Sequence, residues 1–379
     1  MQIDAKHLRG MDKAETVRIA LAAGGTGGHL YPGLALAEAL RENTSVEIMF
    51  IGTAHGLENN ILPTLPYRFE RIWIRGLQRK FSLANLLFPV RLVVSLLQCA
   101  FLFLTFRPDI VLGTGGYVSG PALMMGLLLR IPTAVQEQNS YPGLVNRFLG
   151  KKVNQVYLTF DDSRKYFAGQ QNVVVSGNPV RADIARTNRN SAATRFGLDA
   201  HKITLLIFGG SQGAHAINQM VLRSLAVILT NEGLQLLWAT GEADWQQVFQ
   251  KCTEVAKRVK VTKYIDAMAS AYAASDFVLC RAGASTLSEL ALCGLPAILV
   301  PYPYAAENHQ EFNARSVEEA GAAMTILEKE LTTDTLAQAV SKLANDGALR
   351  QKMAQASFKL ARPDAAREIA ANLLTMTNT

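Results

Sequence analysis

The sequence predicts an α/β protein of two domains, each with a parallel sheet covered by helices on both faces. Short apolar runs rich in β-branched residues alternate with amphipathic segments, which is the pattern of parallel strands joined by helices. The pattern begins a second time after the polar stretch 181–201. A chain of 379 residues is also longer than one hydrophobic core usually organises.

The expected strands fall into two series. The first comprises residues 17–23, 46–52, 109–113, 132–137 and 172–177. The second comprises residues 203–210, 234–240, 259–265, 276–280 and 296–301. We expect the domains to join near the sequence GNPVR at 177–181, with ligands at the carboxyl ends of the strands and the active site in a cleft between the domains.

The composition is that of a globular chain, with 49% apolar and 18% charged residues. The formal net charge of +7 favours an anionic partner but does not choose among nucleic acid, phosphorylated metabolites and acidic lipid. The four cysteines form no CxxC pair, and the N-terminus carries no apolar export segment. We therefore expect reduced thiols and a location inside the cell.

Residues 83–106 form the most apolar stretch of the chain. The uninterrupted run between Arg91 and Arg107 would cover roughly 22 Å as a helix, which is short of the ~30 Å hydrocarbon core. We therefore predict no membrane span, and two interpretations remain open. One is a buried helix. The other is a surface that docks on an anionic bilayer, because basic and apolar side chains alternate just upstream, namely Trp73, Arg75, Leu77, Arg79, Lys80, Phe81 and Leu83.

Three loops repeat one arrangement, in which a strand runs into glycines and then into a helix. They lie at residues 22–29, 112–120 and 208–215. Such a loop directs backbone N–H groups and the positive end of a helix at an anion, for which phosphate is the natural guest. None matches the P-loop or the dinucleotide fingerprint. A single loop of this kind can equally be a tight turn, but three of them favour a diphosphate ligand.

Two further segments carry candidate binding residues. After the expected strand 276–280, a turn of small residues leads into a helix whose first turns offer Ser285, Thr286, Ser288 and Glu289. The hydroxyls and N–H groups suit a phosphate and the glutamate suits a ribose diol, although an ordinary capped helix is the alternative. A cluster of polar side chains that suits sugar hydroxyls, or merely forms a polar surface, follows at Asn308, His309, Gln310 and Asn313.

Eight motifs in the same order make the chain resemble the MurG family. They are GGTGGHLYPGLALAEAL, GTGGYVSGP, EQNSYPGLVNR, GNPVR, GGSQGA, YIDAMASAYAASD, RAGASTLSEL and ENHQEFNA. Members of that family are bacterial glycosyltransferases that move N-acetylglucosamine from UDP onto lipid I, the undecaprenyl-pyrophosphate-linked muramyl pentapeptide, giving lipid II. The resemblance implies a GT-B type fold with two Rossmann-like domains. Residues 1–180 would form the acceptor and membrane-facing domain, 181–360 the donor domain, and the C-terminal helix, about 361–379, would pack back on the first.

The resemblance also implies a set of site residues. The backbone of Ile265 would meet the uracil, Glu289 the ribose and Gln310 the donor sugar. The diphosphate would lie against Ser211 and the turn formed by Ala284, Ser285, Thr286, Leu287 and Ser288. The donor side would be completed by Thr26, Gly27, Gly28, Asn139 and Arg181. The acceptor would be held by the glycine loops of the first domain with Gly115, Gly116 and Tyr117.

The chemistry expected from this resemblance is a single displacement at the anomeric carbon by the acceptor C4 hydroxyl, which inverts configuration. His29 is the first candidate for the base because its reference pKa lies near neutrality, and Glu137 is the competitor. The family usually has a histidine where this chain has Gln136, which shifts weight onto His29. No DxD pair occurs near the phosphate elements, so we expect no metal and no cofactor, with helix dipoles and hydroxyls assisting departure of UDP.

The expected partners are UDP-GlcNAc, lipid I and an anionic membrane surface, without nucleic acid, at the cytoplasmic face of the bacterial inner membrane. Two other classes remain as alternatives. A UDP-sugar 2-epimerase would share the fold and the donor site, but would need more acid and base side chains and no membrane-facing segment. A non-catalytic membrane-peripheral protein that binds nucleotide sugars would lose the polar cluster at 308–313, which is intact.

Overall fold

The computed structural model describes residues 16–43, 45–76, 86–180, 184, 187–210 and 212–378. The chain divides into two compact units. The first comprises Met1–Gln136, Phe148–Val156 and Ala366–Thr379, and the second comprises Glu137–Arg147 and Tyr157–Ala365. Each unit is an α/β structure, and the predicted fold class of two Rossmann-like domains is confirmed.

The first sheet has seven strands in the order β3-β2-β1-β4-β5-β6-β7, and neighbouring strands from β3 to β5 pair in parallel. Its strands are β1 (Val17–Ala22), β2 (Val46–Gly52), β3 (Arg68–Arg71), β4 (Ile110–Gly113), β5 (Thr133–Glu137), β6 (Gln155–Leu158) and β7 (Val173–Val175). The central strands consist almost entirely of buried apolar residues, as expected for a sheet covered on both faces.

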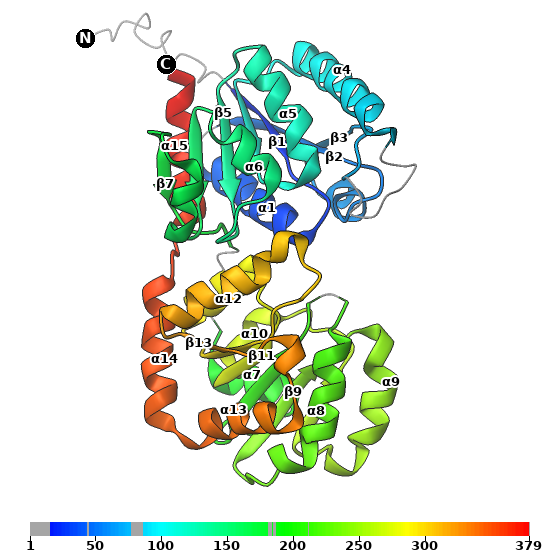
Figure 1. The fold of residues 1–379 in the computed structure, drawn as a ribbon, viewed down its shortest axis with the longest axis vertical. Coiled ribbons are helices and arrows are strands. Elements are labelled where there is room, and N and C mark those ends of the chain that lie inside the picture. The colour runs from blue at the N-terminus through cyan, green and yellow to red at the C-terminus, as the bar shows by residue number, and fades with distance from the viewer. Residues whose placement is uncertain are drawn as a thin grey trace, which may run out of the picture. The chain divides into compact units, whose positions relative to one another are not determined.

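The helices that accompany this sheet are α1 (Gly27–Asn43), α2 (Glu58–Ile61), α4 (Phe88–Phe106), α5 (Gly116–Leu128), α6 (Leu144–Leu149) and α15 (Ala365–Thr375). α4 packs along α5, and Figure 1 shows the two side by side. Pro89 stands in the first turn of α4, where its missing N–H costs nothing, and the left-handed backbone of Arg107 (φ 53°) ends the helix.

The second sheet has six strands in the order β10-β9-β8-β11-β12-β13, all paired in parallel. They are β8 (Ile203–Phe208), β9 (Leu234–Ala239), β10 (Val259–Thr262), β11 (Phe277–Cys280), β12 (Ala297–Leu299) and β13 (Ala323–Thr325). The helices are α7 (Arg189–Phe196), α8 (His215–Ile228), α9 (Glu242–Lys251), α10 (Met268–Ala273), α11 (Ala284–Cys293), α12 (His309–Glu319), α13 (Thr333–Asn345) and α14 (Gly347–Leu360). Short 3₁₀ turns occur at Leu62–Thr64, Asp161–Phe167, Thr253–Val255, Ala306–Asn308, Glu328–Glu330 and Met376–Asn378.

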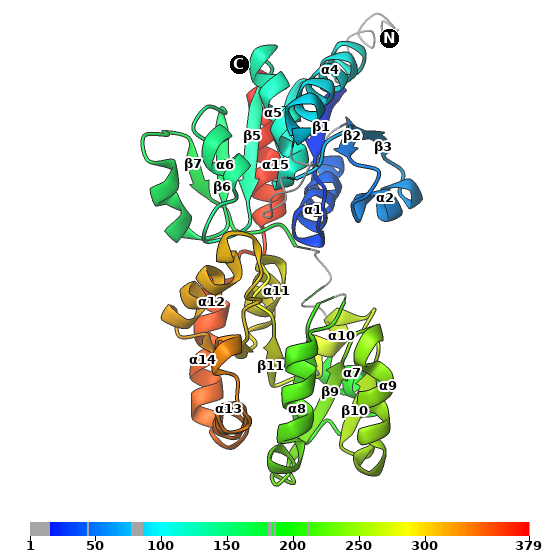
Figure 2. The ribbon, with the colours of Figure 1, turned by 45° about the vertical axis from the view of Figure 1, so that its right-hand side comes forward.

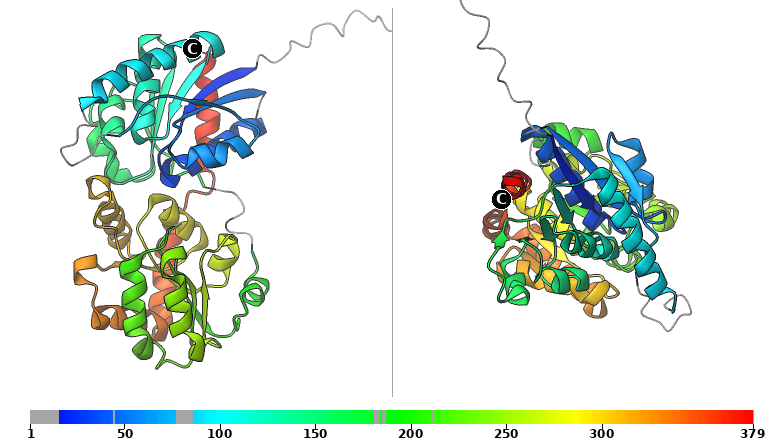
Figure 3. Two further views of the ribbon diagram at one scale, coloured as in Figure 1. Left: turned by 90° about the vertical axis from the view of Figure 1, so that its right-hand side faces the viewer. Right: turned by 90° about the horizontal axis from the view of Figure 1, so that it is seen from above.

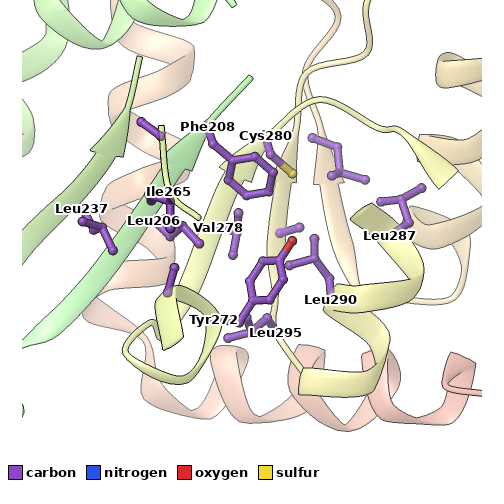
Figure 4. Packing of buried hydrophobic residues seen from close by; sticks show 14 of the residues in the cluster. Leu206, Phe208, Leu237, Ile265, Tyr272, Val278, Cys280, Leu287, Leu290 and Leu295 are labelled. Atoms are coloured by element: carbon purple, nitrogen blue, oxygen red, sulfur yellow. The ribbon is translucent and has the colours of Figure 1, made fainter. Parts of the chain in front are cut away.

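Helices lie on both faces of each sheet, as Figures 2 and 3 show. In the second sheet this arrangement produces two separate apolar clusters. One holds Phe208, Tyr272, Leu287 and Leu290, and Figure 4 shows these side chains between β11 and α11. The other cluster covers the opposite face and is centred on Trp238, which has no solvent exposure.

The strand orders determine where the glycine loops lie. β1 pairs with β4, and β8 pairs with β11. In each sheet this pair marks the point at which the chain changes direction across the sheet, and ligands of doubly wound sheets bind beyond the carboxyl ends of such strands. The loops that follow β1 and β4 therefore share one edge of the first sheet, and those that follow β8 and β11 share one edge of the second.

Candidate active site

The two glycine loops of the first unit touch each other beyond the ends of β1 and β4. Gly116 has a left-handed backbone (φ 74°), and a Cβ atom there would come 2.9 Å from the carbonyl oxygen of Gly24. Gly25 is also left-handed, with φ 90°. Side chains at these positions would strain the backbone and separate the loops, which explains the glycines.

His29 stands in the first turn of α1 and is oriented by the neighbouring loop. Its Nδ1 atom lies 3.1 Å from the carbonyl oxygen of Thr114, and the Thr114 hydroxyl donates to the carbonyl of His29 at 2.8 Å. Because a carbonyl only accepts, Nδ1 carries the proton and the lone pair of the neutral ring lies on Nε2. A Cβ atom on Gly116 would lie 3.7 Å from this Nε2 atom, so the ring is packed against the second glycine loop.

The remaining predicted residues of the first unit gather around this pair of loops. Thr26 and Gly28 are exposed and Gly27 is half-buried. Gly115 donates its N–H to the Ser119 hydroxyl at 3.0 Å. The ring of Tyr117 lies against Gly25, where a Cβ atom would come within 3.3 Å of it. The structure therefore brings Thr26, Gly27, Gly28, His29, Gly115, Gly116 and Tyr117 to one edge of the first sheet.

Glu137 ends β5 and is completely surrounded by hydrogen-bond donors. One carboxylate oxygen accepts the N–H of Asn139 at 2.8 Å and its side-chain amide at 3.1 Å. The other accepts the N–H of Gly143 at 3.0 Å and the amide of Asn146 at 2.8 Å. Burial raises the pKa of the Glu137 carboxyl, and these hydrogen bonds oppose the rise. The carboxylate thus holds the turn that follows β5.

This turn is tied to α12 through Asn313, which is fully buried. The Asn313 amide donates to the side-chain oxygen of Asn139 at 3.1 Å and to the carbonyl of Ala282 at 3.2 Å. Its own oxygen accepts the N–H of Ser140 at 2.8 Å. Asn313 therefore fixes Asn139, a predicted donor residue, relative to the loop after β11.

A cavity of about 560 Å³ opens at the edge of the second sheet, where the loops after β8 and β11 meet. The amino ends of α8 and α11 both border it, so their N–H dipoles point toward a common space. The cavity includes two predicted donor residues, Thr286 and Gln310. It is lined by Phe208, Gly209, Gly210, Gln212, Gly213, Ala214, His215, Ala216, Arg281, Gly283, Thr286, Tyr302, Gln310 and Glu328. Ser211 and Arg181, also predicted, lie outside the described residues.

Gln310 has a defined amide orientation. Its side-chain oxygen accepts the backbone N–H of Tyr302 at 3.0 Å. The Nε2 group is then the end that can donate to a ligand in the cavity, since the oxygen is already committed to the backbone.

Glu289 lies one turn further along α11, and its carboxylate accepts the Tyr272 hydroxyl at 2.8 Å. Burial and the adjacent carboxylate raise the pKa of Tyr272, so this hydroxyl stays protonated and donates. Glu289 is not among the residues that line the 560 Å³ cavity, whereas Leu287 and Ser288 line a separate cavity of about 260 Å³. Figure 4 shows Tyr272 and Leu287 in the core beside β11.

The other predicted residues of this region are largely buried. The side chains of Ala284 and Ile265 are buried. Only the backbone of Ile265 therefore offers polar groups to a ligand. The Ser285 hydroxyl oxygen is buried and has no hydrogen-bond partner among the described residues. It therefore has capacity to bind a ligand group at the start of α11.

Two polar residues that line the 560 Å³ cavity, Arg281 and His215, were not predicted from the sequence. Arg281 pairs with Glu328 at 2.5 Å, donates to the carbonyls of Val300 and Pro301, and lies over the ring of Tyr302. His215 is 2.7 Å from Asp244. Arg281 comes directly before the turn of small residues. This position in the sequence could have indicated a cation at the end of β11.

Glu58 in the first unit was also missed. Its carboxylate is fully buried beneath the glycine loop after β1 and accepts the N–H of Gly25. An acidic residue at the start of a short helix gives no sequence signal of such burial, because glutamates are mostly exposed. Among the described residues, no group of three or more His, Cys, Asp or Glu side chains is arranged to hold a metal ion.

Comparison with known proteins connects both units to one enzyme class. Residues 19–158 match the glycosyltransferase family 28 N-terminal domain, and residues 204–369 match the glycosyltransferase family 28 C-terminal domain. A relative from Desulforamulus reducens is 42% identical over 360 residues, which cover 93% of this chain and 97% of the relative. It is named UDP-N-acetylglucosamine–N-acetylmuramyl-(pentapeptide) pyrophosphoryl-undecaprenol N-acetylglucosamine transferase.

Solved structures agree with this result. The crystal structure of Acinetobacter baumannii MurG is similar with a TM-score of 0.78 and 26% identity, covering 95% of this chain and 99% of that one. A crystal structure of a UDP-N-acetylglucosamine 2-epimerase has a TM-score of 0.67 at 15% identity, covering 95% of this chain and 96% of that one. The second likeness concerns the fold alone.

The GT-B fold and its two matched domains define a glycosyltransferase of family 28. Within that class the chain belongs to the MurG family, and the resemblance drawn from its motifs is confirmed.

Proposed function

We propose that this protein transfers N-acetylglucosamine from UDP-GlcNAc to the C4 hydroxyl of lipid I, with inversion at the anomeric carbon, and so produces lipid II for peptidoglycan synthesis. The substrates follow those in the names of its relatives. The observation that carries the proposal is the orientation of His29, whose Nε2 lone pair lies beside two glycine loops that can receive a diphosphate. We assign the acceptor side to residues 1–180 and the donor side to residues 181–360, with the helix at 361–379 on the acceptor side.

In the proposed reaction His29 removes the proton from the acceptor hydroxyl as its oxygen bonds to the anomeric carbon and the bond to UDP breaks. The proton ends on Nε2 and the negative charge on the UDP diphosphate. Glu137 is the weaker candidate for this base, because its two oxygens already accept four hydrogen bonds. Its role is to shape the turn that carries Asn139.

The charge that develops on UDP is stabilised in the second unit. The amino ends of α8 and α11 supply N–H donors, the Ser285 hydroxyl supplies a further donor, and Arg281 supplies a positive charge. These groups are present before the reaction and need no reorganisation as the charge grows. Departure of UDP therefore requires no metal ion in this proposal.

The decisive experiment incubates the purified protein with labelled UDP-GlcNAc, with and without a soluble lipid I analogue. A transferase releases UDP only when the acceptor is present and places the label on it. A 2-epimerase would convert the donor without any acceptor, and a non-catalytic binding protein would do neither. Release of UDP that does not depend on the acceptor would contradict the proposal.

We further propose that the protein binds peripherally to an anionic membrane surface, at the cytoplasmic face, through α4. Among the described residues α4 is the one helix long and apolar enough to cross a bilayer by length and composition. One face of it, including Cys99, Leu102, Phe103 and Phe106, is buried in the protein. The opposite face exposes large apolar side chains, at Val90, Val93, Leu97, Phe101 and Leu104. A helix with one buried and one exposed apolar face suits a position in the plane of the interface rather than across it.

The structure describes only some of the basic residues that we expect to assist this membrane contact. Arg75 is exposed, and the Arg91 guanidinium lies 5.6 Å from the centre of the Trp73 ring. Arg79, Lys80, Phe81 and Leu83 lie outside the described residues.

Replacing Glu289 by alanine is expected to raise the donor KM about tenfold to 150-fold. A carboxylate that binds a ribose diol makes charge-assisted hydrogen bonds worth roughly 1.5–3 kcal/mol. The substitution also removes the partner of Tyr272, so Tyr272→Phe is the matched control and should leave the donor KM nearly unchanged. Initial rates at varied UDP-GlcNAc decide the matter, and an unchanged KM in a folded Glu289→Ala variant would refute the ribose assignment.

A further inference from the structure

We propose that Glu58 is a positioning residue for the transfer reaction, which fixes the glycine loop 24–28 and through it the placement of His29. The inference rests on the proposed function, since it concerns the loop assigned to the acceptor. Glu58 is the first residue of α2 and has no solvent exposure.

Both oxygens of the Glu58 carboxylate are used for hydrogen bonding. Oε2 accepts the backbone N–H of Gly25 at 2.9 Å. Oε1 accepts the backbone N–H and the hydroxyl of Thr53, each at 2.9 Å. All three partner groups donate hydrogen bonds, so both terminal atoms of the side chain at position 58 must be acceptors.

The surrounding backbone leaves room for this carboxylate and for little else. A Cβ atom on Gly24 or on Gly52 would come within 2.6 Å of Glu58, and one on Gly56 within 1.9 Å. These glycines come from three separate segments, after β1, at the end of β2 and in the turn before α2. Their lack of side chains is explained by the carboxylate that occupies the space between them.

The bond from Gly25 connects this buried group to the proposed base. It holds Gly25 in its left-handed conformation with the N–H directed inward, away from any ligand. The next residue, Thr26, uses its carbonyl to accept the N–H groups of His29 and Leu30, at 3.2 and 3.1 Å. Only one peptide unit therefore separates the peptide that Glu58 fixes, 24–25, from the peptide 26–27, whose carbonyl starts α1 and accepts the N–H of His29.

The substitution Glu58→Gln isolates this role, because it preserves size and shape but converts one acceptor into a donor. If the amide NH₂ faces Gly25, two donors oppose each other at the loop. If it faces Thr53, the same conflict arises there, and the Gly25 bond loses its charge assistance. Either orientation weakens the fixation of the loop without creating a cavity.

The experiment measures full kinetics of the Glu58→Gln variant with a lipid I analogue, binding of UDP, and the ring NMR signals of His29. We expect kcat/KM for the acceptor to fall about tenfold to a hundredfold, as for the loss of one or two hydrogen bonds. The His29 signals should shift, while the Kd for UDP should stay within about twofold, because the cavity at the second sheet is made from other residues. Glu70→Gln in β3 makes the same chemical change at a partly exposed glutamate and should alter none of these.

Unchanged acceptor kinetics and His29 signals would overturn the proposal, as would a loss of activity matched by an equal loss of UDP binding. Gly56→Ala is a second variant, which pushes the carboxylate aside without removing it, and it should reproduce the shift of the His29 signals. If neither variant folds, Glu58 is a folding element and the proposal fails. An inactive wild-type protein would refute the proposed function, whereas the His29 signals would still report whether Glu58 holds the loop.

Discussion

Replacement of His29 by alanine is expected to lower kcat by about 10²- to 10⁴-fold, the usual contribution of a general base, while the Kd for UDP-GlcNAc changes little. The expectation follows from the Nδ1 bond to the Thr114 carbonyl, which leaves the basic lone pair on Nε2. Single-turnover rates with saturating donor and a lipid I analogue measure the effect.

Anchoring and proton transfer at this position can be separated. In His29→Asn the side-chain amide can still donate to the Thr114 carbonyl, but it has no basic nitrogen. We expect this variant to be as slow as His29→Ala and more stable. His201→Ala, at an exposed histidine of the second unit, serves as the control. A variant of His29 that retains more than about a tenth of wild-type kcat would exclude the base role.

Replacing Leu97, Phe101 and Leu104 together by serine is expected to weaken the binding of the protein to anionic vesicles more than about a hundredfold. These side chains are each about two-thirds exposed on one stripe of α4. Partial insertion of each into the bilayer interface is worth about 1 kcal/mol, so the three together account for about two decades of affinity. Turnover of a short-chain soluble acceptor should remain unchanged.

The control for this variant changes three exposed apolar residues of the second unit to serine, namely Val227, Phe249 and Phe358. Sedimentation with vesicles that contain acidic lipid compares the two triple variants. Equal binding of the α4 variant and the wild type would mean that α4 does not dock on the membrane. Added salt should weaken only the electrostatic contribution to vesicle binding, because charge interactions are screened over about 10 Å at 0.1 M.

Most strands were predicted from the sequence, including the edge strands β7 and β10, whereas β3, β6 and β13 were not. β1, β2, β4 and β8 coincide closely with predicted runs because strands buried on both faces must be apolar throughout. β3 escaped prediction because its sequence RFER carries three charged residues, which suits an exposed edge. The expected strand at 259–265 ends at Thr262, since the chain turns away before Ile265.

The candidate site divides in the same way. Glycine loops are visible in a sequence because backbone geometry restricts the residue type. Asn313 was named from the sequence as part of a polar cluster, but the contacts of Glu58, Arg281 and Asn313 involve partners elsewhere in the chain, such as Ala282 for Asn313, and these partners could not be predicted from local sequence. Glu137 was named from the sequence only as a candidate base, and its four hydrogen bonds to the turn after β5 could not be predicted from that sequence.

The membership of α15 in the first unit has a practical consequence for protein engineering. Ile369, Ala370 and Leu373 are fully buried, although more than two hundred residues of the second unit precede them in the chain. A gene fragment that stops after the first sheet would omit this helix and leave its apolar binding surface open to water and to aggregation. Split-protein complementation or domain exchange within the family must therefore transfer the C-terminal segment together with the earlier segments of the first unit, and a fluorescent protein fused to the C-terminus would label the first unit.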